Sequence, residues 1–246
     1  MSDPGTALPI PAEMLLLAYR SGIFPMADHK DDTDIFWVEP RERAIIPLDG
    51  FHLSRSLAKA VRQDRLRVTC NRAFAEVMAL CAEPRGSDQG TWISERIRQS
   101  YLALNRVGHA HSIECWQGDH MVGGLYGVQF ERAFCGESMF SRETDASKVA
   151  LTWLVALLRH AGAELLDCQF MTPHLATLGA IEISQAEYLD LLGKSGAGPA
   201  ARPLPEAYVT LLGDGVAAGA GVGAAEPAEG SSSPGKLILH SLTQTS

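Results

Sequence analysis

A change in the spacing of apolar residues near residue 111 constrains this fold more than any other feature of the sequence. Upstream, apolar residues recur at helical spacing, whereas three consecutive runs, 111–117, 120–130 and 133–140, alternate with a period of two. Two-residue turns join the runs, so they are predicted to pair as an antiparallel meander. The following helix, predicted over 146–160, is apolar nearly all round and must be buried against that sheet.

Glycines interrupt the middle strand of the meander at Gly123, Gly124 and Gly127. A glycine inside a strand marks a bulge, or a second backbone or a ligand lying close against it. Either arrangement would splay the sheet, and we therefore expect a slot at this position.

The run from Glu164 to Gln169 follows the apolar helix and predicts a further strand. Asp167 and Gln169 are two residues apart, so both side chains would leave the same face of the sheet. A lone carboxylate is costly to bury in apolar surroundings, which favours a hydrogen-bonded or a catalytic Asp167. The plainer alternative is that Asp167 only braces the next turn.

Three regions of different character divide the chain. Residues 1–45 predict a small N-terminal unit, with a helix beginning at Pro11 and a strand at 35–38, which is too small to fold alone. Residues 46–193 predict the main domain, whose core elements follow the order β-β-β-α-β-α-β. Residues 194–246 contain nine of the 23 glycines, with few large apolar residues, and predict a disordered tail.

Composition excludes several classes of protein. There is neither an apolar run of about 18 residues nor a basic leader followed by an apolar stretch, so neither a membrane span nor export is predicted, and a cytoplasmic location is the default. The five cysteines form neither a CxxC pair nor a cluster with zinc-ligand spacing, so no metal site is predicted. The net charge of −8 argues against a general binder of polyanions.

Positive charge is nevertheless concentrated in one region. Between residues 41 and 72 there are eight Lys or Arg against three acids. Arg55, Lys59 and Arg62 fall on one side of a helix predicted from Ser54, opposite its apolar side. A solvated helix face is the common explanation for such a stripe, but the absence of interleaved acids also suits contact with a phosphate backbone.

The element order resembles that of the Gcn5-related acyltransferase (GNAT) fold, in which a splayed mixed sheet receives an activated acyl donor. The resemblance implies an α+β protein, with a small N-terminal α/β unit packed on a GNAT-like mixed-sheet domain flanked by helices. Those enzymes bind the acyl-CoA pyrophosphate at a Gly-rich turn before the central helix. The corresponding turn here, 141–146, has no glycine and two acids, so acetyl-CoA is a poor fit and no cofactor is predicted.

Nine ordered segments together resemble one family, the leucyl/phenylalanyl-tRNA–protein transferases. The resemblance covers roughly residues 10 to 192, and ordered segments at matching spacings are far more specific than a single motif. The segments are Tyr19-Arg-Ser-Gly-Ile-Phe-Pro25, His52-Leu-Ser-Arg55, Gly90-Thr-Trp-Ile93, Gly108-His-Ala-His-Ser-Ile-Glu114, Val122-Gly-Gly-Leu-Tyr-Gly127, Phe134-Cys-Gly-Glu-Ser-Met-Phe-Ser141, Ala146-Ser-Lys148, Asp167-Cys-Gln169 and His174-Leu-Ala-Thr-Leu-Gly-Ala180.

The resemblance implies an activity and its partners. The family moves Leu, Phe or Met from aminoacyl-tRNA to a protein whose N-terminal residue is Arg or Lys, which creates a degradation signal. Aminolysis of the tRNA ester needs a neutral amine, a stabilised oxyanion and a proton for the leaving ribose oxygen, but no metal. We expect Gln169 to orient the amine or the ester carbonyl, and Asp167 to assist through Gln169 or electrostatically. By the family pattern, Glu137 holds the aminoacyl α-ammonium or the adenosine.

Further residues are expected to select the substrate. Leu125, Phe134, Cys135 and Leu154 would form an apolar pocket for an amino acid without β-branching, unless they are plain core residues. Trp37 and Trp92 could stack on the terminal adenine, although isolated aromatic residues more often serve packing. Arg55, Lys59 and Arg62 would contact phosphates of the acceptor stem without reading its sequence.

Other functions remain open at this point. A sister family transfers Leu to N-terminal Asp or Glu, and a non-catalytic tRNA-binding module would share the cationic helix. An acyl-CoA N-acyltransferase would need the missing pyrophosphate cradle. A cysteine hydrolase would pair Cys135 or Cys168 with His111 or His174.

Overall fold

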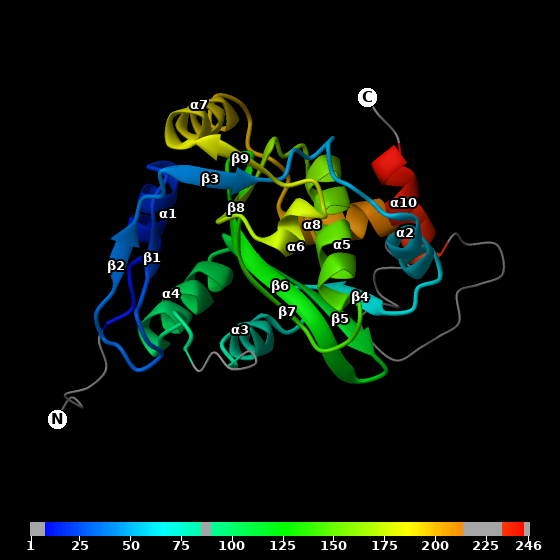
Figure 1. The fold of residues 1–246 in the computed structure, drawn as a ribbon, viewed down its shortest axis with the longest axis horizontal. Coiled ribbons are helices and arrows are strands. Elements are labelled where there is room, and N and C mark those ends of the chain that lie inside the picture. The colour runs from blue at the N-terminus through cyan, green and yellow to red at the C-terminus, as the bar shows by residue number, and fades with distance from the viewer. Residues whose placement is uncertain (1–7, 85–89, 214–232, 244–246) are drawn as a thin grey trace.

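A seven-stranded mixed sheet forms the centre of the molecule (Figure 1), and the computed structural model describes residues 8–84, 90–213 and 233–243. The strand order is β4-β5-β6-β7-β8-β3-β9. The predicted α+β class is confirmed. The strands are β3 (Glu42–Ile45), β4 (Arg67–Cys70), β5 (Ala110–Gln117), β6 (His120–Phe130), β7 (Ala133–Ser141), β8 (Leu165–Gln169) and β9 (Ile181–Ser184).

The predicted meander is present as β5, β6 and β7, which pair antiparallel in sequence order. Two of its glycines permit close approach of other parts of the chain. A Cβ at Gly123 would lie 2.5 Å from the Cβ of Ala146 at the start of the next helix, and one at Gly127 would lie 2.3 Å from the carbonyl oxygen of Cys135. The register also shifts between Tyr126 and Gly127, as expected for a bulge.

The opening in the sheet lies beside β7 rather than within the meander. Helix α5 (Ala146–Ala161) connects β7 to β8, and these two strands pair in parallel only from Ala133↔Leu165 to Cys135↔Asp167. After Cys135 the two strands have no further paired residues, and β7 continues to Ser141 paired with β6 alone. The separation leaves room for a cavity between the sheet and the helices that follow.

Helices cover both faces of the sheet and bury one core on each. The first face carries α2 (Arg55–Arg62), α5, α6 (Pro173–Ala176), α8 (Leu204–Leu212) and α10 (Pro234–Thr243). The second carries α1 (Ala12–Arg20), α3 (Phe74–Cys81), α4 (Glu95–Arg106) and α7 (Gln185–Ser195). The predicted burial of α5 is confirmed, since 13 of its 16 residues are buried.

The N-terminal segment is packed closely on the central sheet. Its own two-stranded sheet consists of β1 (Phe24–Met26) and β2 (Phe36–Val38), and α1 packs its inner face into the second core. Strand β3 lies within the range predicted for this unit, yet it belongs to the central sheet and pairs with both β8 and β9. Strand β4 was not predicted, because four residues in a charge-rich stretch give too short a pattern to identify.

The disordered tail predicted for residues 194–246 is wrong for two segments. Helices α8 and α10 both pack against α5, and α10 also packs against α2. Their apolar residues recur at helical spacing and are buried: Leu204, Ala207, Tyr208 and Leu212 in α8, and Ile238 and Leu239 in α10. The average composition of the tail obscured these two short patterns. Residues 214–232 and 244–246 lie outside the described part of the chain.

None of the helices in the described ranges is long and apolar enough to cross a membrane.

Candidate active site

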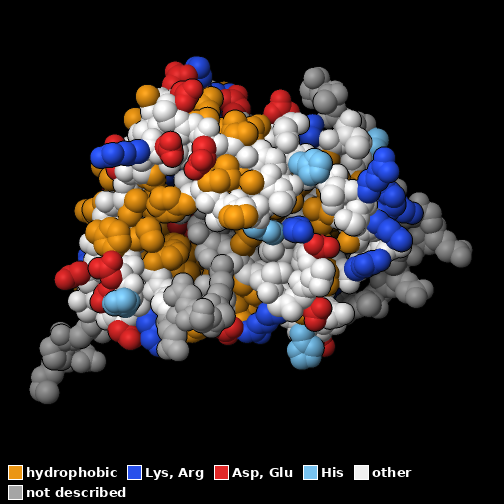
Figure 2. Space-filling view, in the orientation of Figure 1, with side chains coloured by type: hydrophobic (Ala, Val, Ile, Leu, Met, Phe, Trp, Pro, Cys, Tyr) orange, Lys and Arg blue, Asp and Glu red, His pale blue; other side chains and the backbone are white. Residues whose placement is uncertain are grey.

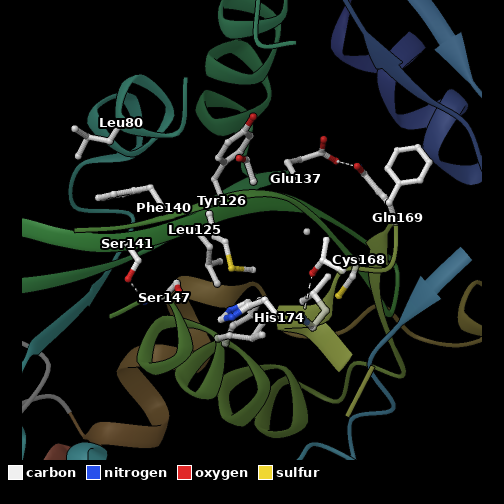
Figure 3. Close-up of a pocket in the computed structure, with 18 of the residues that line it drawn as sticks. Leu80, Leu125, Tyr126, Glu137, Phe140, Ser141, Ser147, Cys168, Gln169 and His174 are labelled. Carbon is white, nitrogen blue, oxygen red and sulfur yellow. Dashed lines mark hydrogen bonds between the residues drawn. The ribbon is translucent and has the colours of Figure 1, made fainter. Parts of the chain in front are cut away.

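A cavity of about 810 Å³ lies where β7 leaves β8, between the sheet and helices α5 and α6 (Figure 3). Five of the predicted site residues line it: Leu125, Glu137, Leu154, Gln169 and Trp92. Its wall toward α5 is mainly apolar, and its other lining residues include Met26, Met139, Leu151, Leu166, Cys168, Phe170, Ser147 and His174. The cavity thus combines an apolar wall with a polar edge.

Glu137 on β7 is the most strongly hydrogen-bonded side chain of that polar edge. Its Oε1 accepts hydrogen bonds from the hydroxyl of Tyr19 at 2.6 Å and from Nε2 of Gln169 at 3.0 Å, and its Oε2 accepts one from the hydroxyl of Tyr101 at 3.1 Å. The two tyrosine hydroxyls also hydrogen-bond each other. Burial raises the pKa of Glu137 to about 7, and the three donors oppose that shift. Glu137 is therefore held in a fixed position and titrates near neutral pH.

Gln169, the last residue of β8, faces Glu137 (Figure 3). Its backbone is left-handed, with φ of 62°, and its backbone N–H donates to Oδ1 of Asp167 at 2.8 Å. Because its amide nitrogen is engaged by Glu137, its amide oxygen is left as an acceptor for a ligand in the cavity. The structure therefore places Gln169 as predicted, in contact with the open space.

Asp167 is hydrogen-bonded, which is one of the two roles that the sequence favoured, and it also braces the turn at Gln169. It is fully buried and does not line the cavity. Its Oδ1 and Oδ2 accept hydrogen bonds from Nε and Nη2 of Arg43 at 2.9 Å and 2.6 Å, and Oδ2 also accepts one from the hydroxyl of Tyr188 at 3.1 Å. Every strong acceptor position is occupied by the protein itself, so direct contact of Asp167 with a substrate does not fit this geometry.

Three other predicted residues are not brought to the cavity. Phe134 and Cys135 are fully buried in the two cores on opposite faces of the sheet and are absent from the cavity wall. Trp37 lies on β2, opposite Pro25, and lines a separate surface groove with residues of the N-terminal segment. All three were assigned from their position in a pattern, which does not fix how a side chain is directed once the strands twist.

Four partners of the polar edge were not singled out from the sequence, namely Tyr19, Arg43, Tyr101 and Tyr188. Tyr19 and Tyr101 lie among the apolar residues of α1 and α4, so their periodicity indicates only burial. A polar tip on a buried helix face is the one signal that could have identified them. Arg43 looked like part of the cationic region, yet it is completely shielded from solvent.

The predicted cationic face is formed as expected. In α2, Leu57 and Val61 are buried, whereas Arg55, Lys59 and Arg62 are exposed. Figure 2 shows Lys and Arg side chains gathered along the edge of the molecule where Figure 1 places α2. Within the described part of the chain, none of the three forms an ion pair.

Two further features of the described residues are the possible metal ligands and the cysteine thiols. The described residues contain no group of three or more His, Cys, Asp or Glu side chains that could hold a metal ion. Burial raises the pKa of the Cys135 and Cys168 thiols, which disfavours the reactive thiolate. The cysteine hydrolase considered from the sequence is therefore not favoured.

Comparisons with known proteins agree with this geometry. Sequence models of the leucyl/phenylalanyl-tRNA protein transferase match residues 45–193, and those of its N-terminal domain match residues 9–41. A leucyl/phenylalanyl-tRNA–protein transferase of Novosphingobium aromaticivorans is 60% identical over 96% of this chain and 97% of its own length. Those of Rhizorhabdus wittichii and Zymomonas mobilis are 58% and 55% identical, each over 74% of this chain and over 74% and 68% of their own lengths.

Among solved structures, L-PGS from Bacillus licheniformis aligns with a TM-score of 0.35 and 13% identity, over 67% of this chain and 55% of that one, which is too weak a likeness to support an argument. The two family matches follow each other in chain order, and the relatives are similar over most of their length. The chain therefore belongs to the leucyl/phenylalanyl-tRNA protein transferase family and is an aminoacyltransferase.

Proposed function

We propose that this aminoacyltransferase moves Leu, Phe or Met from aminoacyl-tRNA to the α-amine of a protein whose N-terminal residue is Arg or Lys. The product carries a new peptide bond and a destabilising N-terminal residue, which marks the protein for degradation. The observation that best supports this proposal is the cavity itself, in which an apolar wall meets the Glu137–Gln169 pair. An amino acid ester needs both features, one for its side chain and one for its amine and carbonyl group.

The reaction is an aminolysis. The nitrogen of the acceptor amine attacks the ester carbonyl carbon, the bond from that carbon to the ribose oxygen breaks, and the proton lost from nitrogen ends on the ribose oxygen. No cofactor or metal is consumed in this exchange. The protein has to bind, orient and stabilise charge, and those contributions account for much of the rate enhancement in such reactions.

Glu137 is proposed to hold the α-ammonium of the aminoacyl group. A buried carboxylate beside a cation is favourable only where the geometry is fixed, and Tyr19 and Tyr101 provide that fixation. An ammonium next to Glu137 would lower the pKa of the carboxyl group back toward its ordinary value, because the opposite charge favours the ionised form. Substrate binding and ionisation of Glu137 would thus reinforce each other.

Gln169 is proposed to orient the ester carbonyl or the incoming amine, and Asp167 to position Gln169. The contact between Asp167 and the backbone N–H of Gln169 holds the left-handed turn that directs the amide into the cavity. Asp167 is therefore a positioning residue in this proposal. Its charge is largely compensated by Arg43, which leaves it only a minor electrostatic role.

The apolar wall is proposed to select the amino acid. Leu125 and Leu154 face the cavity from β6 and α5, together with Met139 and Leu151. A β-branched side chain would place bulk at the mouth of this pocket, and one misplaced methyl group is worth about 1–3 kcal/mol in discrimination. Leu, Phe and Met share an unbranched Cβ, which fits the substrates of the proposal.

The tRNA is proposed to lie across α2, with its terminal adenine on Trp92. Trp92 and Met26 of β1 both line the cavity. Exposed Arg55, Lys59 and Arg62 supply charge for the acceptor stem. We further propose that residues 1–45 form a small N-terminal unit and residues 46–193 a GNAT-like main domain. The proposed location is the cytoplasm, where aminoacyl-tRNA is found.

The decisive experiment measures transfer of labelled Leu from Leu-tRNA to two peptides that differ only in their first residue, Arg or Asp. We expect label on the Arg peptide and none on the Asp peptide. Label on the Asp peptide alone would identify the acidic-acceptor leucyltransferase instead. Binding of Leu-tRNA without transfer to either peptide would identify a non-catalytic tRNA-binding module.

A further inference from the structure

An apolar strip on the N-terminal unit adjoins the cavity. In the two-stranded sheet, Phe36 of β2 lies opposite Met26 of β1, so both side chains leave the same face, and Met26 lines the cavity. Val38 lies two residues farther along β2 and therefore on that same face. Phe36 is 42% exposed, and Val38 is half-buried. This face of the sheet therefore presents apolar side chains to solvent beside the candidate active site.

The strip continues from β2 toward Gln169. Val38 lies opposite Phe24 in β1, and the ring of Phe24 contacts that of Phe170 edge-on, with 5.8 Å between their centroids. Phe170 directly follows Gln169, lines the cavity and is 46% exposed. Phe36, Val38 and Phe170 thus form one apolar strip, which ends beside the residue proposed to orient the ester or the incoming amine.

The surroundings of the apolar strip are negatively charged. Residues 28–42 contain six acids against two Lys or Arg. Asp34 lies two residues before β2 and Glu39 directly after it; both are exposed, and neither forms an ion pair with another residue in the described ranges. Figure 2 shows acidic side chains beside a concentration of apolar ones over the N-terminal unit. Such a surface repels a phosphate backbone and attracts a cationic polypeptide.

The charge of the molecule is divided between two ends. The cationic face of α2 lies at one end and the β1–β2 sheet at the other (Figure 1). The two substrates of the proposed reaction differ in the same way, because tRNA is a polyanion and the acceptor protein begins with Arg or Lys. Each substrate therefore meets a surface of opposite charge when it approaches from its own end. A second copy of this chain would instead bring like charges together at the strip.

We propose that the apolar strip of Phe36, Val38 and Phe170 binds the segment of the acceptor protein that follows its N-terminal Arg or Lys. The segment lies extended, and four residues of it span about 13 Å from the reacting end. Its apolar side chains pack on the strip, and its basic side chains approach Asp34 and Glu39. This inference rests on the proposed function and deepens it, because acceptor selection then extends beyond the first residue.

The test compares acceptors of two lengths. The short one is Arg-Ala amide, which ends before the strip, and the long one is Arg-Ala-Leu-Phe-Ala-Lys amide. Packing of apolar side chains on an exposed surface corresponds to about a 3- to 10-fold change in binding, so on the wild type we expect the long acceptor to have a KM lower by about that factor, at similar kcat. A third acceptor, in which Asp replaces Leu and Phe, should bind no better than the short one.

The variant Phe36→Ala tests the strip itself. It should remove most of the KM advantage of the long acceptor and leave the kinetics of the short acceptor and the KM of Leu-tRNA unchanged. Unchanged transfer to the short acceptor also shows that the variant is folded. Leu17→Ala, which alters an exposed leucine of α1 in the same unit, is the matched control and should behave as the wild type with all three acceptors.

Several outcomes would overturn the proposal. Equal KM values of the short and long acceptors on the wild type would exclude the contact, and this arm needs no variant. A raised KM of Leu-tRNA in Phe36→Ala would assign the strip to the tRNA. A wild-type dimer that Phe36→Ala dissociates in analytical ultracentrifugation would assign it to a second copy. Failure of the wild type to transfer Leu to either Arg acceptor would overturn the proposed function, and this inference with it.

Discussion

Arg43 donates two hydrogen bonds to the two carboxylate oxygens of Asp167, at 2.9 Å and 2.6 Å, and both side chains are completely shielded from solvent. The guanidinium also stacks between the rings of Phe24 and Tyr188, at 4.9 Å and 4.3 Å from their centroids. Its remaining Nη1 donates to the carbonyl oxygen of Gly22 at 3.0 Å. This pair ties the N-terminal unit, β3, β8 and α7 together directly behind the candidate active site.

Breaking this pair should destabilise the protein and displace Gln169. Removing one partner of a buried ion pair leaves an uncompensated charge, so we expect Asp167→Asn to lower the free energy of unfolding by about 3–5 kcal/mol. Urea denaturation measures this loss. The matched control is Asp190→Asn, which breaks the exposed Asp190–Lys194 pair and should change little. A loss of transfer activity with unchanged stability would instead indicate that Asp167 takes part in the chemistry.

Glu137 should make stability depend on pH in a defined direction. Its pKa is raised from 4.5 to about 7 by burial, so the folded state favours the protonated form. The stability associated with that form is fully present below pH 4.5 and is lost as pH rises through about 7. We expect the difference in unfolding free energy between the wild type and Glu137→Gln to change by about 3 kcal/mol over this window. Parallel curves for the two proteins would contradict the assignment.

Salt should weaken tRNA binding if α2 meets the phosphates. Three phosphate contacts predict a slope of about −2 to −3 in a plot of log binding constant against log salt concentration. Each of Arg55→Ala, Lys59→Ala and Arg62→Ala should reduce the steepness by about 1. Filter binding at several salt concentrations measures the slopes. A slope that the triple variant leaves unchanged would remove α2 from the interface.

The apolar wall should control which amino acid is transferred. Leu154→Ala enlarges the cavity from the side of α5, so we expect transfer of Phe to increase relative to Leu by a factor corresponding to about 1–3 kcal/mol. Competition between Leu-tRNA and Phe-tRNA gives the ratio directly. Leu189→Ala alters an exposed leucine on α7 and should leave the ratio unchanged. An unaltered ratio in Leu154→Ala would show that selection occurs elsewhere.

The C-terminal helix should be an integral part of the fold. A Cβ at Gly235 would lie 1.9 Å from the carbonyl oxygen of Val61 in α2, and the backbone N–H of Gly235 donates to Asp64 at 2.7 Å. We expect Gly235→Val to force α10 away from α2 and lower the unfolding free energy by about 1–3 kcal/mol. Gly193→Ala, where an added Cβ meets nothing within 4 Å, is the control. Equal stability of the two variants would show that α10 is dispensable.

Much of the lining of the candidate site was predictable from the sequence, and the family matches cover the same span. Glu137, Gln169, Leu125, Leu154 and Trp92 were each assigned from the sequence and each line the cavity. For Phe134 and Cys135 the alternative holds, because both are plain core residues. Both lie where β7 still pairs with β8, and the cavity opens only after that pairing ends.

Local spacing alone determined the meander, the buried helix after it and the strand that carries Asp167 and Gln169, because period and turn chemistry act between near neighbours. Only the tertiary structure decided that Asp167 would face Arg43 and that Gln169 would face Glu137. Arg43 lies 124 residues from Asp167 along the chain, and Glu137 lies 32 residues from Gln169. Pairings over such separations depend on which strands become neighbours and on the left-handed turn at Gln169. The spacing of residues along the chain predicts neither of these features.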